Sequence, residues 1–188
     1  MGHSERRVRG NLFLEYVRAI RAYKSVDWRT NLDAKWRPFV EARIDVNGWY
    51  PMDAFEQLGL FLLDHTEFND EAIRVWGRSS AGALLEKHRF LLAEGDPVET
   101  VIRFRVMRGS FFDFDPVDIE SLDPISASVT VAYGMSDRAE RAAFHQTMGF
   151  FEGVLDLSRV EDVTVVIAEK AWEGADRTLV HFSWKPPR

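Results

Sequence analysis

The sequence predicts an α+β fold, with N-terminal helices packed on a small antiparallel sheet in the order helices, strand, helix, strand, strand. Up to Met107, apolar residues recur at the spacing of amphipathic helices. After Pro116 the apolar period falls to about 2 residues, which is typical of half-buried strands. Because helices and strands are segregated along the chain, an antiparallel sheet is favoured over a parallel, doubly wound one.

Local signals place the helices of the first part of the chain. A first amphipathic helix is predicted over residues 11–23, and a second helical segment is interrupted by Pro38. Another helix begins near Pro51. Asn69-Asp70-Glu71 is a typical N-terminal cap for a longer helix, and Asp96-Pro97 combines a capping carboxylate with proline at the first helical position.

The last part of the chain is predicted to contain a strand, a helix and a hairpin. The strand covers residues 126–133, the helix contains residues 143–155, and two strands over 163–169 and 178–184 are joined by a turn with glycine. Gly149 and Gly153 share one face of the helix, so we expect them to allow close packing on a neighbouring element.

Composition limits the classes of function. A chain of 188 residues with 46% hydrophobic content predicts one domain over residues 11–188, preceded by a flexible basic N-terminus over residues 1–10. Zero cysteines exclude disulfides, thiolate metal sites and a cysteine nucleophile. The net charge of -6 argues against nucleic-acid binding, and no apolar run is long enough to cross a bilayer. We expect a cytoplasmic protein.

The sequence contains no motif of an enzyme or a metal site. Its five histidines lack metal-ligand spacing, and Ser79-Ser80 and Ser128 lie outside a nucleophile elbow. His181 alternates with the apolar residues of its strand, which predicts a solvent-facing or hydrogen-bonded side chain. We therefore predict that the protein is not an enzyme.

Aromatic residues are abundant, with six tryptophans and fourteen phenylalanines. Such side chains either fill a core or line an apolar cavity. We predict that a ligand pocket between the helices and the sheet is lined by Trp76, Phe104, Phe112, Phe150 and Trp172. The alternative, which the sequence leaves open, is that these rings interdigitate in an ordinary core.

The C-terminal part resembles a known superfamily of ligand-binding and vesicle-tethering domains. The matching stretches are Gly149-Phe150-Phe151-Glu152-Gly153-Val154-Leu155, Val163-Thr164-Val165, Glu169, Gly174-Ala175-Asp176 and Phe182-Ser183-Trp184. The superfamily includes vinyl-4-reductase-type sensor domains and TRAPP subunits, with haem-dependent nitric-oxide-binding domains as more distant members of the fold group. The N-terminal helices with Trp49-Tyr50-Pro51 are similar to an uncharacterised bacterial family of about this length.

The resemblance implies a non-catalytic sensory or binding domain that holds a small apolar ligand between helices and sheet. The alternative is a protein-interaction or homodimerisation module like the TRAPP subunits, without a ligand. The sequence departs from the metal-binding relatives, because cysteines do not follow Glu169. The Tyr-x-Ser-x-Arg haem motif of the nitric-oxide sensors is also missing. We therefore expect no cofactor, neither zinc nor haem.

Overall fold

The computed structural model describes residues 6–185 and divides the chain into two compact units. The first unit comprises Met1–Phe68 and Arg108–Asp115, and the second comprises Asn69–Met107 and Pro116–Arg188. Where the sequence predicted one domain over residues 11–188, the contacts therefore group into two bodies. The chain passes from one unit to the other at three points, because residues 108–115 return to the first unit.

The first unit is mainly helical. Its elements are β1 (Arg7–Arg9), α1 (Gly10–Ala22), α2 (Trp28–Asn31), α3 (Arg37–Glu41), β2 (Trp49–Pro51), α4 (Met52–His65) and the 3-10 turn η2 (Arg108–Ser110). Stacked aromatic rings hold α1 in place. Tyr16 stacks on Phe55 of α4 with ring centroids 4.3 Å apart, and Phe13 stacks on Tyr50 of β2 at 4.6 Å. Phe13, Tyr16 and Phe55 are buried members of the core of the first unit, and Tyr50 is partly buried.

The basic N-terminal stretch is ordered where it was expected to be flexible. Strand β1 pairs with β2, and Val8 between its arginines is fully buried. Its other edge bonds to the returning segment, since the Arg9 backbone N–H donates to the Phe111 carbonyl at 2.8 Å and Arg7 forms an ion pair with Asp113. The prediction of a tail over residues 1–10 is thus wrong at Arg7–Arg9, and residues 1–5 lie outside the described part.

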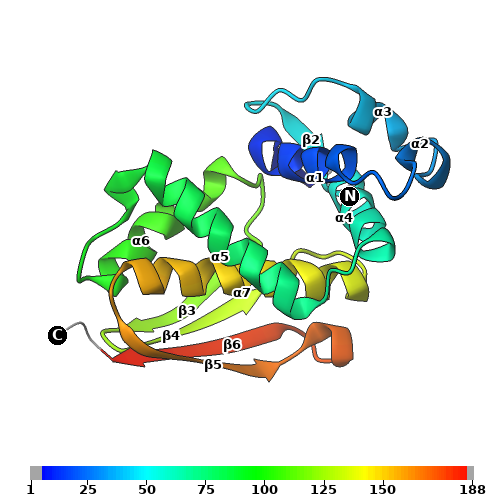
Figure 1. The fold of residues 1–188 in the computed structure, drawn as a ribbon. Coiled ribbons are helices and arrows are strands. Elements are labelled where there is room, and N and C mark those ends of the chain that lie inside the picture. The colour runs from blue at the N-terminus through cyan, green and yellow to red at the C-terminus, as the bar shows by residue number, and fades with distance from the viewer. Residues whose placement is uncertain (1–5, 186–188) are drawn as a thin grey trace, which may run out of the picture. The chain divides into compact units, whose positions relative to one another are not determined.

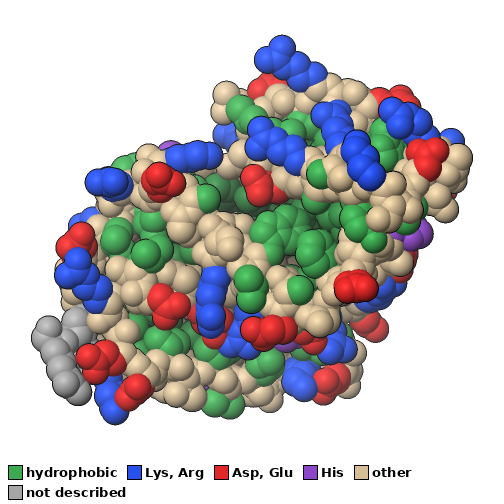
Figure 2. All heavy atoms as spheres, in the orientation of Figure 1, with side chains coloured by type: hydrophobic (Ala, Val, Ile, Leu, Met, Phe, Trp, Pro, Cys, Tyr) green, Lys and Arg blue, Asp and Glu red, His purple; other side chains and the backbone are tan. Residues whose placement is uncertain are grey.

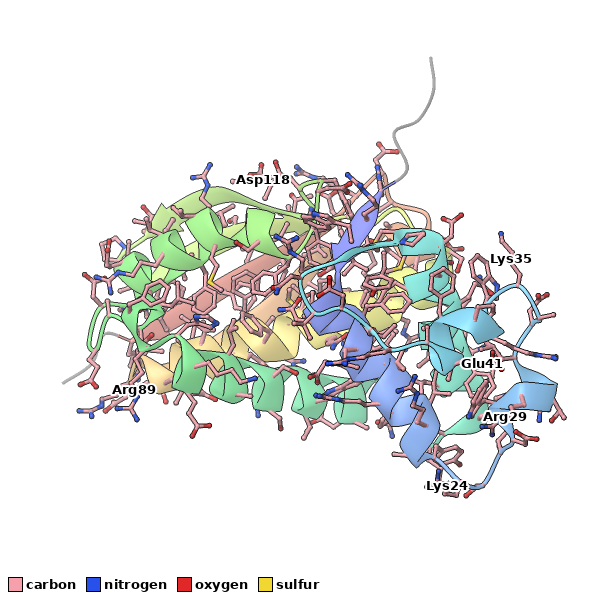
Figure 3. All side chains as sticks on the ribbon, turned by 90° about the horizontal axis from the view of Figure 1, so that it is seen from above. Lys24, Arg29, Lys35, Glu41, Arg89 and Asp118 are labelled. Atoms are coloured by element: carbon pink, nitrogen blue, oxygen red, sulfur yellow. The ribbon has the colours of Figure 1, made fainter. Side chains whose placement is uncertain are left out.

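Two cationic side chains in the segment that contains α2 and α3 pack on tryptophan rings. The guanidinium of Arg29 lies 4.4 Å from the centroid of Trp28, and the ammonium of Lys35 lies 4.2 Å from that of Trp36. Lys24, Arg29 and Lys35 point away from the body of this unit (Figure 3). Arg29 and Lys35 thereby cover apolar ring surface while their charged groups stay in water.

The second unit is layered. Its elements are α5 (Asp70–Lys87), η1 (Arg89–Leu91), α6 (Pro97–Met107), β3 (Val117–Asp123), β4 (Ser126–Val131), α7 (Asp137–Leu157), β5 (Glu161–Glu169), η3 (Ala171–Glu173) and β6 (Thr178–Lys185). The sheet has the order β3-β4-β6-β5, and every neighbouring pair is antiparallel. Helix α7 lies between α5 and this sheet (Figure 1).

The predicted fold class is confirmed, and the structure adds strands β1, β2 and β3 to the predicted order of elements. The α+β class, the antiparallel sheet and the final hairpin are as expected. Strand β3, which the sequence-based prediction omits, precedes β4. Its register shifts between Ile119 and Ser121, and this bulge interrupts the alternation that would have identified the strand. No helix among residues 6–185 is long and apolar enough to span a bilayer.

Helices α5 and α7 approach each other backbone to backbone through glycines. A Cβ atom on Gly149 would lie 1.9 Å from the carbonyl oxygen of Arg74, and one on Gly77 would lie 2.1 Å from that of Gln146. At Gly153 the nearest atom would be the Cβ of Ala81 at 3.0 Å. The prediction that Gly149 and Gly153 are packing glycines is therefore confirmed.

We expect Gly149→Ala to lower the free energy of unfolding by about 3 kcal/mol, because the added methyl group must push the two helices apart. Gly82→Ala is the matched control in α5, since no atom lies within 4 Å of the Cβ position there. That control should gain about 1 kcal/mol from helix propensity alone. Chemical denaturation of both variants measures the difference, and equal effects would contradict the close contact.

Candidate functional site

An apolar cluster lies where α5, α6 and α7 meet, and we call it the helical cluster. Its buried members are Ala81, Leu85, Leu91, Phe104 and Val154, and its partly buried members are Leu84, Leu92, Met107 and Phe150. The second group leaves part of the cluster open to solvent. An apolar site with some accessible surface is the usual form of a site for a small ligand.

The start of α6 is fixed by side-chain hydrogen bonds, and this positions Phe104 in the cluster. The Asp96 carboxylate accepts the backbone N–H of Glu99 at 2.8 Å, as the capping signal predicted. Thr100 is fully buried, and its hydroxyl accepts the N–H of Ala93 and donates to the carbonyl of Asp96. Local sequence therefore determines where α6 begins.

Aromatic rings connect the helical cluster to the sheet. Phe104 meets Phe150 edge to face, with ring centroids 5.3 Å apart. Phe150 contacts Phe151 at 6.3 Å, and Phe151 contacts Phe182 of β6 at 5.8 Å. These four rings form a continuous path from α6 through α7 to the sheet, which we call the aromatic path.

The five predicted pocket residues are not all in one place. Phe104 and Phe150 touch in the helical cluster. Trp172 lies against Phe144, nearer the start of α7, at a centroid distance of 5.0 Å. Phe112 belongs to the first unit, and Trp76 is a partly buried residue of α5. The pair Phe104 and Phe150 is therefore the part of the predicted set that the structure brings together.

A buried ion pair beside the glycine contact escapes sequence analysis. Glu152 on α7 receives two hydrogen bonds from the guanidinium of Arg74, and Arg78 donates a third at 2.9 Å. The Glu152 side chain is only 7% exposed, and its partners lie 74 and 78 residues earlier in the chain. The short spacing of Arg74 and Arg78 on one helix face was a visible signal, but it did not identify Glu152 as their partner.

The surroundings of Glu152 act in opposite directions on its pKa. Burial alone would raise the pKa, but hydrogen bonding and the charges of Arg74 and Arg78 outweigh it and lower the pKa below its usual value. Glu152 is therefore charged in the folded protein at neutral pH. A carboxylate in this state binds α5 to α7 and is unsuited to act as a general base.

The described histidines are engaged at places other than the helical cluster. In the first unit, the ring of His65 packs on Phe61, with centroids 4.5 Å apart. His88 ends α5 and packs on Phe90, whose side chain is 68% exposed. His181 lies on the exposed face of the sheet, where its Nδ1 is 2.8 Å from the hydroxyl of Ser128. This confirms the prediction of a solvent-facing or hydrogen-bonded His181.

His145 is held against the N-terminal end of α5. Its Nε2 lies 3.3 Å from the Asp70 carboxylate, which also binds Arg141. Burial lowers the pKa of His145 below its usual value, and the nearby cations act in the same direction, although Asp70 opposes them. The imidazole is thus neutral near pH 7, with one ring nitrogen beside a carboxylate.

The helical cluster does not supply the usual ligands of a haem iron. Iron is usually held by histidine, cysteine, tyrosine or a methionine paired with histidine. The helical cluster offers the Met107 thioether and no histidine. Tyr133 is buried, which raises its pKa to about 12, and its hydroxyl is hydrogen-bonded to Thr147 at 2.7 Å. Residues 6–185 also contain no group of three or more side chains suited to a metal ion.

Comparison with known proteins identifies the architecture. No protein-family model matches the sequence, and no curated protein matches it. Solved structures do match: an unliganded Fe(II) H-NOX protein from K. algicida has a TM-score of 0.66 at 12% identity, covering 94% of this chain and 96% of that chain. This chain has the H-NOX fold.

Further H-NOX structures cover the chain equally well. An H-NOX protein from S. oneidensis in the Fe(II)NO ligation state gives a TM-score of 0.63 at 12% identity, over 94% of this chain and 99% of that chain. A mutant H-NOX from T. tengcongensis gives 0.62 at 14% identity, over 95% and 98%. The resemblance noted in the sequence included nitric-oxide-binding domains as distant members, and the H-NOX fold agrees with that part. The closer affiliation with vinyl-4-reductase domains and TRAPP subunits stays a prediction.

We expect Glu152→Gln to lower the free energy of unfolding at pH 7 by roughly 2–3 kcal/mol, because it leaves Arg74 without its charged partner. The pKa of Glu152 is lowered by folding, so its stabilisation is present above the unfolded pKa and is lost as the pH falls through the folded pKa. The difference between variant and parent should therefore begin to shrink below about pH 4, near the unfolded pKa, and should vanish only when the pH lies below the lowered pKa of the folded protein.

The control for this prediction is Asp156→Asn on the same helix. Asp156 is exposed and lies 4.0 Å from Arg78, so its loss should change stability by less than about 0.5 kcal/mol. Denaturant unfolding at several pH values measures both variants. A pH-independent effect at Glu152 would show that the charge of the pair contributes nothing.

Proposed function

We propose that the protein is a non-catalytic sensory domain that binds a small apolar ligand in the helical cluster, without haem. The observation that carries this proposal is that Phe150 and Met107 stay partly exposed at the edge of an otherwise buried cluster, in a chain with the H-NOX fold. Two H-NOX structures are of Fe(II)NO and Fe(II)CO ligation states, so that fold holds small ligands in those proteins.

The helical cluster suits an uncharged, apolar molecule. Its side chains are hydrocarbon, aromatic rings and one thioether, with Glu152 directed toward α5. Such surfaces bind by removing apolar area from water, at roughly 25 cal/mol for each Å². A ligand that packed on Phe150 and Met107 would contact α7 and α6 together. It would thus act on the packing of α6, the helix whose start is fixed by Asp96 and Thr100.

The absence of enzymatic activity belongs to the same proposal. The hydroxyl of Ser128 and the ring of His181 are paired on the open face of the sheet, where water has free access. Among the described residues, no carboxylate hydrogen-bonds to His181 to orient it. A serine nucleophile needs such an oriented base and a site that stabilises the developing oxyanion.

Binding of an apolar fluorescent probe such as N-phenyl-1-naphthylamine tests the ligand site. We expect saturable uptake by the parent protein and weaker uptake by Phe150→Trp, because the larger ring would occupy the accessible space. The melting temperature of this variant should stay close to that of the parent. Phe90→Trp is the matched control, since Phe90 is 68% exposed and outside the aromatic path. Strong destabilisation by Phe150→Trp, together with no uptake by the parent, would leave only a packed core.

Absorption spectroscopy tests the absence of haem. We expect protein from haem-supplemented cultures to show no Soret band after gel filtration, because the helical cluster presents no histidine. A stoichiometric band would overturn the haem-free part of the proposal. The apolar ligand site would still be tested by uptake of the naphthylamine probe, which does not depend on haem.

A further inference from the structure

Helix α6 is apolar on two opposite sides. Its inward side buries Val101 and Phe104 in the second unit. On the outward side, Val98, Ile102 and Val106 follow one another at intervals of four residues and form one stripe. The exposed fractions are 42% for Ile102 and 81% for Val106. A surface helix normally presents polar residues to water, so an apolar outer stripe indicates a further contact.

The turn between β3 and β4 adds a second apolar projection. Pro124 and Ile125 form this turn, and the Ile125 side chain is 54% exposed. Turns favour glycine, asparagine, aspartate and serine, so the turn itself does not require a β-branched apolar residue. Buried Trp184 holds the turn rigidly, since its backbone N–H donates to the Ile125 carbonyl and its indole N–H to the Pro124 carbonyl, both at 3.0 Å.

A hollow of about 420 Å³ lies between the start of α6 and this turn. We call it the α6 groove, and its lining residues are Gly95, Asp96, Pro97, Val98, Glu99, Ile102, Leu122, Asp123 and Pro124. The lining combines apolar side chains with three carboxylates, and no lysine or arginine of the described part of the chain belongs to it. Hydrophobic side chains reach the surface among charged groups on the face of this unit that bears α5 and α6 (Figure 2).

The carboxylates give the α6 groove a negative rim. Asp96 accepts a backbone N–H of its own helix, and Asp123 lies 3.4 Å from the Ser126 hydroxyl. Neither carboxylate forms an ion pair with a cation among residues 6–185. Glu99 pairs with Arg103, which is outside the lining. Two of the three charges therefore remain available to a positively charged partner.

We propose that the α6 groove docks a basic amphipathic helix of a partner protein. The apolar face of that helix would cover Val98, Ile102 and Ile125, and its lysine or arginine residues would lie beside Asp96 and Asp123. This is helix-in-groove recognition, in which apolar anchors supply affinity and rim charges supply orientation. The proposal stands independently of any ligand in the helical cluster.

The charge of the groove favours such a partner over a second copy of this chain. In a two-fold symmetric dimer the same patch meets itself. Asp96 and Asp123 of one protomer would then face the same carboxylates of its partner, which is repulsive. A cationic helix avoids this repulsion, because its lysine or arginine side chains pair with Asp96 and Asp123.

The test uses a labelled synthetic peptide of about three helical turns, with leucines on one face and lysines on its flanks, titrated by fluorescence anisotropy against the full chain. We expect binding that weakens roughly ten-fold or more in Ile102→Ser, in Ile125→Ser and in Asp123→Lys. Val166→Ser is the matched control, because Val166 is also 54% exposed but lies on β5, outside the groove. Thermal melts establish that each variant is folded.

Three results would overturn the proposal. They are equal binding of a peptide with glutamates in place of lysines, an equal loss of binding in Val166→Ser, and a homodimer in sedimentation that Ile102→Ser dissociates. The naphthylamine probe distinguishes this test from that of the proposed function. Ile125→Ser should reduce peptide binding and leave probe uptake unchanged, whereas Phe150→Trp should do the reverse.

Discussion

The backbone contact between α5 and α7 determines the arrangement of the second unit. At Gly149 the carbonyl of Arg74 occupies the space where any other residue would place its side chain. This short distance lets Glu152 reach both Arg74 and Arg78, so an ion pair that needs close helices is found beside the glycines that permit them. With its glycine face committed to α5, α7 turns Phe151 toward Phe182 of the sheet. The three layers thus depend on residues with no side chain at all.

Interactions between residues close together in the sequence could be predicted from the sequence. Asn69 and Asp96 cap their helices as expected, because a capping side chain bonds to a backbone N–H only three residues away. The β5–β6 hairpin and the spacing of Gly149 and Gly153 were equally local signals. Interactions between segments far apart in the sequence could not be predicted. Strand β1 has only three residues, too few to show a hydrophobic period. Its Arg7 bonds to Asp113, 106 positions later, and a sequence pattern does not predict such a distant partner.

The candidate site shows the same division. Sequence analysis proposed Phe104 and Phe150 together, and their rings are in edge-to-face contact in the structure. It also grouped Phe112 and Trp172 with them, and the structure puts these in another unit and at another part of α7. The sequence does not show which aromatic residues will contact one another, because the hydrophobic effect favours burial of all of them and is non-directional. Glu152 was missed for a related reason, because a charged residue between glycines suggests an exposed position until its two arginines are seen.

The returning segment Arg108–Asp115 has a consequence for how this protein can change by recombination. Because it supplies the bonding partners of β1, the first unit is assembled from two separate stretches of chain. A crossover after Phe68 that brought in a foreign N-terminal half would leave Asp113 and Phe111 facing a strand they did not evolve with. A single crossover in the gene therefore cannot exchange the whole of the first unit, because its residues lie on both sides of residues 69–107.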